Sequence, residues 1–256
     1  MNSVRNILAI AGKELRSYFA SPIAYILIGF FLLPFGVFFY LYLDAFVKQS
    51  MQMAQYGGAV NVNQGVIRYV LQNASVIILF IMPMITMRTY SEEKRSGTIE
   101  LLLTSPVTDL EIILGKFFGA LGVYAAMLAV TLLYMAILFV YGNPEWRPMV
   151  VGYLGLLLMG GTFIAIGLLI SSTTNNQIVA GVVTFVVFLL FWIIGWFAES
   201  AGPTIGPITR WLSITEHFDD FSKGIIDTKH VLYYLSLITF GLFMTAKSVD
   251  TERWRG

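Results

Sequence analysis

A short charged segment between residues 89 and 100 interrupts a chain that is otherwise strongly apolar. Five of its twelve residues carry a charge, namely Glu92, Glu93, Lys94, Arg95 and Glu100. Carboxylates can act in acid–base catalysis, but no histidine or cysteine accompanies this group. Side chains of both signs beside a glycine that permits a turn are better suited to recognising another protein. The segment is therefore predicted to be a docking surface.

The alternative for this segment is a solvated loop that follows the positive-inside rule of membrane proteins. That rule counts only lysine and arginine, so it leaves the three glutamates unexplained. The local pattern also predicts helix: Ser91 is a candidate N-cap, and acidic residues in a first turn are favoured by the helix dipole. Residues 99–103 are apolar enough to lie at a membrane face. Thr108 and Glu111 then predict a capping box at the start of a longer helix.

The other residue types that do chemistry are scarce. The chain has no cysteine and two histidines, His217 and His230, which excludes disulfides and thiolate sites and disfavours a histidine metal cluster. No H-E-x-x-H motif is present. Neither histidine lies deep in an apolar stretch, where an intramembrane serine protease needs its base. We expect a protein that is not an enzyme and that binds no cofactor or metal itself.

Nucleotide hydrolysis by this chain is also excluded by its motifs. Gly115 and Lys116 are followed by Phe117, and Leu110 stands where a P-loop has its first glycine. The Ser or Thr that holds Mg²⁺ in a P-loop is therefore missing. Any ATPase that drives this protein must be a separate chain, and ATP and Mg²⁺ are expected there.

Composition places the chain in a membrane. Of its 256 residues 57% are hydrophobic and 12% are charged, about half the charged share of soluble domains, and the mean hydropathy is +0.75. The net charge of +1 gives no reason to expect nucleic-acid binding. Loops between apolar stretches are too short for a second folded unit, so residues 1–256 are predicted to be a single transmembrane domain.

Six apolar stretches predict an all-α integral membrane fold. They lie near residues 22–43, 69–87, 113–141, 149–170, 178–198 and 230–246. Residues 4–19 have apolar side chains at helical spacing on one face and charges opposite, which predicts an amphipathic helix lying flat at the membrane surface. An ordinary helix packed on a soluble core is disfavoured because no such core is available.

The distribution of lysine and arginine predicts the orientation. With the N-terminus in the cytoplasm, ten of the sixteen basic residues fall on the cytoplasmic side and six outside. Both termini are therefore expected in the cytoplasm. Residues 88–112 become a cytoplasmic loop, and residues 199–229 become an external segment.

Two stretches raise questions of packing. Five glycines in the fourth span, residues 149–170, are favoured as helix-packing positions over pore-lining ones. In the external segment Trp211, Phe218 and Phe221 recur on one helical face, with Ser213 and Glu216 as a capping box and Gly224 as a stop. That aromatic face is expected either to anchor in the lipid interface or to cover a translocation path, and the sequence leaves both open.

Once the ends of the predicted spans are trimmed, the spans contain no Asp, Glu, Lys, Arg or His. Ion-coupled transporters and proton pumps usually carry such groups at depth, so energy is expected to enter from outside the membrane. Several polar residues in the spans are candidates to face a path, although hydrogen bonding to neighbouring helices is the commoner role: Gln72, Asn73, Ser75, Thr131, Thr162 and Thr184.

The strings Tyr90–Pro106 and Leu114–Phe117 resemble the motif of ABC-2 type transporter permeases. The early Lys13-Glu14-Leu15 and the six-span layout match that family too. The later run Ser213–Asp227 is similar to its gliding-motility permease (GldF) branch. The resemblance covers nearly the whole chain, and its central motif does not indicate the cargo.

The resemblance implies an ABC-2 type exporter fold in a bacterial cytoplasmic (inner) membrane. It implies that two permease chains pair in the lipid bilayer, as a homodimer or heterodimer, and that each binds a cytoplasmic ABC ATPase subunit. Residues 4–19 become the connecting helix, and the Ser171–Gln177 turn a minor ATPase contact. The coupling helix that docks on the ATPase maps to Tyr90, Ser91, Glu92, Glu93, Lys94, Arg95, Gly97, Thr98 and Glu100.

Two functions other than ATP-driven transport are compatible with six spans. A membrane scaffold could use the same ATPase to transmit force or a signal to a periplasmic or external-domain protein rather than transport substrate. A passive six-span channel is disfavoured, because the charged loop would then have no purpose.

Overall fold

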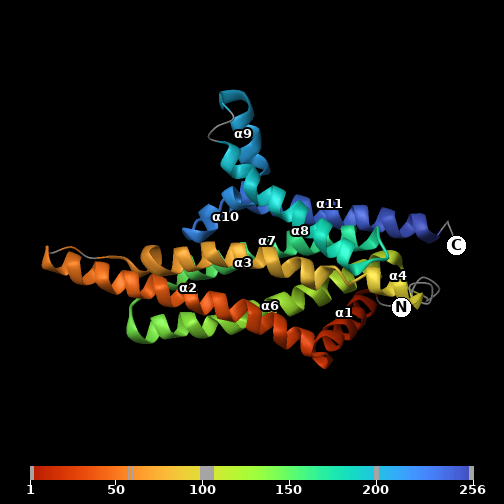
Figure 1. Ribbon diagram of the computed structural model, residues 1–256, viewed down its shortest axis with the longest axis horizontal. Coiled ribbons are helices and arrows are strands. Elements are labelled where there is room, and N and C mark those ends of the chain that lie inside the picture. The colour runs from red at the N-terminus through yellow and green to blue at the C-terminus, as the bar shows by residue number, and fades with distance from the viewer. Residues whose placement is uncertain (1–2, 57, 59, 99–106, 199–201, 254–256) are drawn as a thin grey trace.

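A computed structural model describes residues 3–56, 58, 60–98, 107–198 and 202–253. Within these residues every regular element is helical, and six helices are long and apolar enough to cross a membrane. Figure 1 shows most of them running along the long axis of the molecule. The prediction of an all-helical protein with six spans is therefore confirmed.

The elements follow one another with short connections. Their bounds are α1 Ser3–Ala20, α2 Pro22–Gln55, η1 Asn63–Ile67, α3 Arg68–Thr86, α4 Ser91–Ser96, α6 Asp109–Tyr141, α7 Trp146–Ser172, α8 Gln177–Ile193, η2 Ile194–Ala198, α9 Gly202–Leu212, α10 Ile214–Ser222 and α11 Thr228–Arg253. We call the part of the bundle around α1, α4 and the C-terminus of α7 the α4 end. The part around α9, α10 and the N-terminus of α7 is the α10 end.

Several helices extend beyond the predicted spans. Helix α2 has 34 residues, about 50 Å at 1.5 Å per residue, where the sequence predicted a stop at residue 43. Its polar extension stays helical because good helix formers fill it, and Lys48 pairs with Asp44 one turn earlier at 2.7 Å. Helix α6 begins at Asp109 because Thr108 and Glu111 form the predicted capping box.

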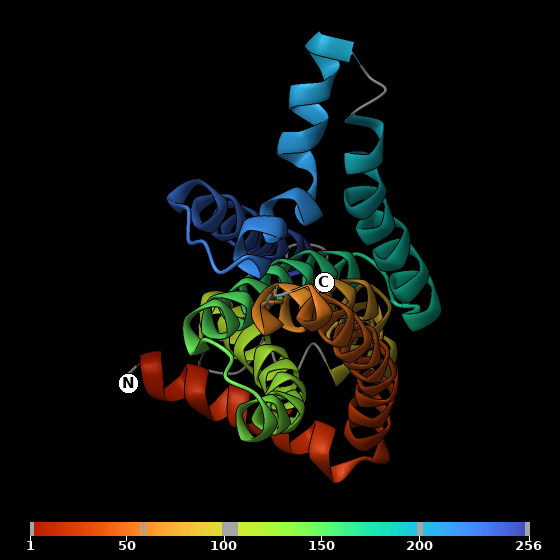
Figure 2. The same ribbon diagram turned by 90° about the vertical axis from the view of Figure 1, so that its left-hand side faces the viewer.

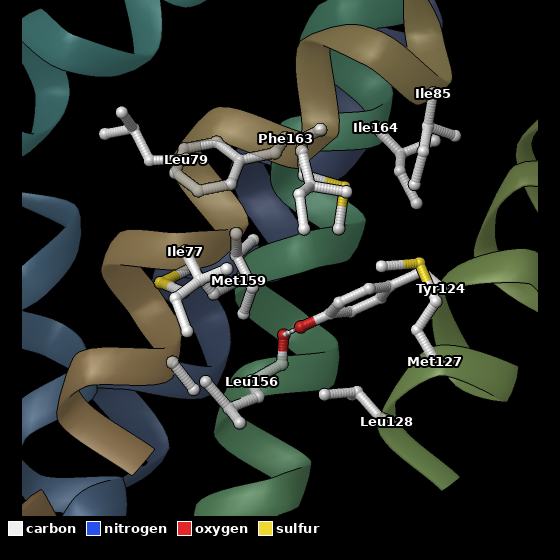
Figure 3. Packing of buried hydrophobic residues seen from close by; sticks show 14 of the residues in the cluster. Ile77, Leu79, Ile85, Tyr124, Met127, Leu128, Leu156, Met159, Phe163 and Ile164 are labelled. Carbon is white, nitrogen blue, oxygen red and sulfur yellow. Dashed lines mark hydrogen bonds between the residues drawn. The ribbon is translucent and has the colours of Figure 1, made fainter. Parts of the chain in front are cut away.

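The core lies where α3, α6 and α7 meet. Figure 2, which looks along the bundle, shows these helices surrounded by α1, α2, α8 and α11. In Figure 3 the side chains of Tyr124, Met159 and Phe163 fill the space between them, and the Tyr124 hydroxyl donates a hydrogen bond to the Leu156 carbonyl at 2.8 Å. The outer helices instead carry large exposed apolar side chains, as surfaces in lipid or against another apolar partner require.

The glycines of α7 let neighbouring helices approach closely. A Cβ at Gly160 would lie 2.2 Å from Cε1 of Tyr124, and a Cβ at Gly167 would lie 2.3 Å from the Thr86 hydroxyl. A Cβ at Gly155 would lie 2.5 Å from that of Phe221 in α10. All five glycines predicted in this span are buried, so the packing interpretation is confirmed.

This packing predicts that one glycine substitution destabilises the protein and that another does not. Gly160→Ala should lower the stability of the folded protein by about 1–3 kcal/mol, because the added methyl group overpacks the contact with Tyr124. Gly29→Ala in α2 is the matched control, since a Cβ there meets nothing within 4 Å and alanine favours helix. Thermal unfolding in detergent should show a lower midpoint for the first variant and no loss for the second. Equal midpoints would contradict the packing described.

Candidate functional site

The charged segment forms a short helix that follows α3 directly. Helix α4 runs from Ser91 to Ser96 and is capped by Gly97, whose φ of 70° is the left-handed conformation that glycine adopts readily. The prediction that Ser91 caps the helix through its side chain is wrong. Its hydroxyl donates instead to the Met87 carbonyl, which continues the turn out of α3. Glu92 and Glu93 lie in the first turn and Lys94 and Arg95 in the last, as the helix dipole favours.

The predicted docking residues divide into an exposed group and an anchoring group. Glu92, Arg95, Gly97 and Thr98 are exposed. Tyr90 and Ser91 are buried, whereas Glu93 and Lys94 are partly buried. Glu100 and the apolar run 99–103 lie outside the described residues. One face of α4 therefore points away from the protein while the other holds it in place.

The C-terminus of α7 anchors the start of α4. The Ser171 hydroxyl accepts hydrogen bonds from the backbone N–H groups of Tyr90 and Ser91, both at 3.1 Å, and donates to the Met87 carbonyl. Lys94 Nζ donates to the Ser172 carbonyl. Ser171 and Ser172 thus support α4 within the chain, a contact that the sequence did not indicate.

A buried lysine joins α4 to two further helices. The Lys116 side chain on α6 is 1% exposed, and its Nζ lies 2.7 Å from Glu93 Oε1 of α4 and 3.3 Å from Glu14 Oε1 of α1. Nζ also donates to the Thr89 carbonyl at 3.0 Å and lies 5.0 Å from the centre of the Tyr90 ring. We call Lys116, Glu14 and Glu93 the lysine cluster.

The structural role of Lys116 was not predicted from the sequence, where it is one of the ten basic residues assigned to the cytoplasmic side. The residue lies about two turns inside α6, since the capping box starts that helix at Asp109. A buried charge is usually paired, so a lysine inside a capped apolar helix was the signal for a carboxylate partner elsewhere. Which carboxylates serve could be seen only in the structure.

Helix α1 reaches Lys116 because two glycines of α6 leave room for it. A Cβ at Gly115 would lie 2.6 Å from Cβ of Ile10, and one at Gly119 would lie 2.6 Å from Cβ of Glu14. The Asn6 amide adds a hydrogen bond of 3.2 Å to Glu111. The predicted amphipathic helix is confirmed as a helix, and its packed face lies against α6.

Tyr18 links the same helix to the end of α3. Its hydroxyl donates to the Ile85 carbonyl at 2.7 Å, and burial raises the pKa of Tyr18 to about 12. The Arg88 guanidinium lies 5.7 Å from the ring centre and pairs with Glu92 at 3.2 Å. Helices α1, α3, α4, α6 and α7 are therefore tied together at the α4 end.

The predicted external helix is two helices, α9 and α10, divided at Ser213. The Ser213 hydroxyl caps α10 by accepting from the Glu216 N–H, and Gly224 has a φ of 83°, so Ser213 is confirmed as the cap and Gly224 as the stop. The return hydrogen bond of the predicted capping box is not formed, because the Ser213 N–H donates to the Thr209 and Arg210 carbonyls. Phe218 and Phe221 are buried against α7, however, and only Trp211 is exposed. The prediction that these two phenylalanines face lipid or a translocation path is therefore wrong. They pack against α7, where Gly155 leaves space for Phe221.

Both histidines of the chain meet at the α10 end. Their Nδ1 atoms are 2.6 Å apart, His217 Nε2 lies 2.9 Å from the Trp211 carbonyl, and His230 Nε2 lies 2.9 Å from Asp220. A carbonyl can only accept, so His217 carries a proton on Nε2. Burial lowers the pKa of His217, and the hydrogen bond to Trp211 opposes this shift only in part.

No group of three metal-binding side chains occurs in the part of the chain that the structure describes.

Most of the polar span residues considered as path-lining candidates form hydrogen bonds with neighbouring residues. Thr131 contacts Tyr153 at 2.7 Å, Thr162 contacts the Tyr234 carbonyl at 3.4 Å, and Asn73 contacts Tyr42 at 2.9 Å. Gln72 and Ser75 also border a cavity at the α10 end.

The lysine cluster predicts a large loss of stability when its cation is removed. Lys116→Met should destabilise the protein by about 3 kcal/mol, because two partly buried carboxylates lose their counter-charge. Lys48→Met is the matched control, since that lysine makes a solvent-exposed pair that should contribute almost nothing. Chemical denaturation in detergent measures both. Adding Glu14→Gln and Glu93→Gln should restore part of the loss, and no recovery would contradict the electrostatic cause.

The histidine pair predicts a dependence of local stability on pH. The folded-state pKa of His217 lies below its unfolded value of about 6.5, so the unfolded state binds the proton more readily. The stabilisation is complete above about pH 6.5 and is lost as the pH falls toward the folded-state pKa. Hydrogen exchange, corrected for intrinsic rates, should accelerate in residues 211–234 between pH 8 and pH 5. His217→Gln should remove most of this acceleration. An undiminished acceleration in the variant would show that His217 is not its cause.

Comparison with known proteins identifies the family. The family model described as ABC-2 family transporter protein matches residues 8–246. The probable multidrug ABC transporter permease YbhR of Escherichia coli strain K12 is 27% identical over 143 residues, as is its counterpart in strain O157:H7. These matches cover 55% of this chain and 38% of the length of each relative.

Members of the matched family are transmembrane components that work with ABC ATPase partners and are not ATPases themselves. The family match spans the six helices, the lysine cluster and the charged helix alike. The chain therefore belongs to the ABC-2 family of transporter proteins.

Proposed function

We propose that this chain is the permease subunit of an ABC transporter, that it pairs with a second permease chain, and that separate ATPase subunits dock on the exposed face of α4. The observation that carries the proposal is the combination of exposure and anchoring in α4. Arg95 is exposed, and so is Glu92 although it pairs with Arg88. Glu93, Lys94 and Ser91 fix the helix to the bundle.

The proposed orientation puts the α4 end in the cytoplasm of a bacterium, with the bundle in the inner membrane. The excess of lysine and arginine near α1, α4 and the C-terminus supports it. Helices α9 and α10 are then external.

The proposed mechanism transmits a movement of the ATPase into the bundle. ATP binding closes the two ATPase subunits and displaces both α4 helices. Each α4 moves α1 and α6 through the lysine cluster and moves α7 through Ser171. The permease pair then rocks as rigid bodies, a transition of known type, to the extent that ATP favours one state over the other.

The proposed direction is export. One relative is named a probable multidrug permease, and multidrug export is accordingly the form of transport that we propose first. The run Ser213–Asp227 suggested membership of the gliding-motility branch. The family match does not test this, so it stays a prediction.

Docking at α4 predicts that reversing an exposed charge weakens ATPase binding. Arg95→Glu should lower the affinity for the cognate ATPase subunit by about tenfold, the effect of losing about 1.4 kcal/mol of interface energy. Arg95 is chosen over Glu93 because a change at Glu93 also breaks the lysine cluster. Co-purification and titration with the ATPase subunit measure the affinity.

Arg147→Glu is the matched control for this experiment. Arg147 is an exposed arginine at the α10 end, so its reversal should leave ATPase binding unchanged. Equal affinity of wild type and Arg95→Glu, with both variants folded, would remove α4 from the interface. ATP hydrolysis by the purified permease alone would contradict the proposal as a whole.

A further inference from the structure

A cavity of about 620 Å³ opens at the α10 end between α3, the junction of α8 with η2, and α10. Its volume is within the range of about 300–1,000 Å³ that small-molecule sites occupy. Six of the residues that border it are Gln72, Trp192, Trp196, Phe218, Glu216 and Asp219. The cavity lies at the end of the bundle opposite the lysine cluster.

Two tryptophans give this cavity an aromatic wall. The rings of Trp192 and Trp196 have centroids 4.7 Å apart and are inclined by 62°, so one indole meets the other edge to face. Trp196 is 66% exposed. An exposed indole face attracts cations through the ring quadrupole, and tryptophan does so most strongly among the aromatic side chains.

The acidic residues of the cavity are not equivalent. Asp219 accepts from Gln72 at 2.8 Å, and its charge is balanced by Arg68 at 3.1 Å and by Lys223. Burial raises the pKa of Asp219, but these two cations outweigh it and leave the pKa below its usual value. Asp219 is thus ionised and already paired.

Glu216 is the acidic residue left over. Its side chain is exposed and makes no ion pair within the described part of the chain. Its backbone N–H serves the cap at Ser213, which fixes the start of α10 and hence the position from which the carboxylate extends. Glu216 also borders a second cavity with Arg210, Lys223 and Lys229, but among the described residues no ion pair joins it to them. The first cavity therefore combines one unpaired carboxylate with two indole rings.

We propose that this cavity binds an amphiphilic organic cation, such as a quaternary or protonated amine with an apolar body. The charge lies near Glu216, and the apolar body contacts Trp192 and Trp196. An organic anion of the same shape is repelled by Glu216, and a neutral hydrocarbon gains nothing from it. That the cation is transported rests on the proposed function, whereas its binding does not.

The test measures binding to the purified permease in nanodiscs, without any ATPase. The probes are radiolabelled tetraphenylphosphonium and tetraphenylborate, which share size and shape and differ in the sign of their charge. Wild-type protein should bind the cation saturably and in preference to the anion. Glu216→Gln and Trp196→Leu should each weaken cation binding by about tenfold.

Glu145→Gln and Trp146→Leu are the matched controls. Both residues are exposed at the α10 end and border no part of this cavity, so these variants should bind the cation as wild type does. All four positions are exposed, and thermal unfolding verifies that each variant is folded. Equal binding of cation and anion, or equal weakening by the controls, would overturn the assignment. That result would leave ATPase docking at α4 untouched, because docking is measured separately.

Discussion

The rest of this architecture depends on the ion pairs that the buried ammonium group of Lys116 makes. Lys116 lies on α6 and pairs with Glu14 of α1 and Glu93 of α4. Three separate segments therefore share one charge in a site almost closed to water. Such a pair is costly to break from one side, so the surface helix α4 is held to the bundle despite its length of six residues.

Helix α7 extends this connection to the opposite end of the protein. Its C-terminal Ser171 supports α4, its central Gly160 packs against Tyr124, and its Gly155 lies under Phe221 of α10. Close packing of this kind leaves little freedom for small independent movements. In the mechanism that we propose, a displacement imposed at α4 is passed to the cavity region as a movement of whole helices. This physical path links the proposed ATPase contact to the proposed cation site.

Local signals in the sequence predicted the local features well. Six apolar stretches predicted the six spans. Thr108 with Glu111 predicted the start of α6, and Gly97 predicted the end of α4. Two local predictions failed, namely the Ser91 cap and the end of α2 at residue 43. The other features that were missed are non-local. Lys116 lies 102 residues from Glu14, and no periodicity connects them. The apolar face of α10 looks the same whether it meets lipid or protein, so only the structure could assign Phe218 and Phe221 to packing.

Hydrogen exchange of the wild-type permease and its Lys116→Met variant tests the central claim most directly. Segments that open together exchange as one cooperative unit. If the lysine cluster holds α1 and α4 to α6, the variant should accelerate exchange in residues 3–20 and 88–96 by a similar factor, at least about tenfold. The middle of α7 should stay as protected as in wild type. Acceleration confined to one of the two segments, or absent from both, would contradict this account.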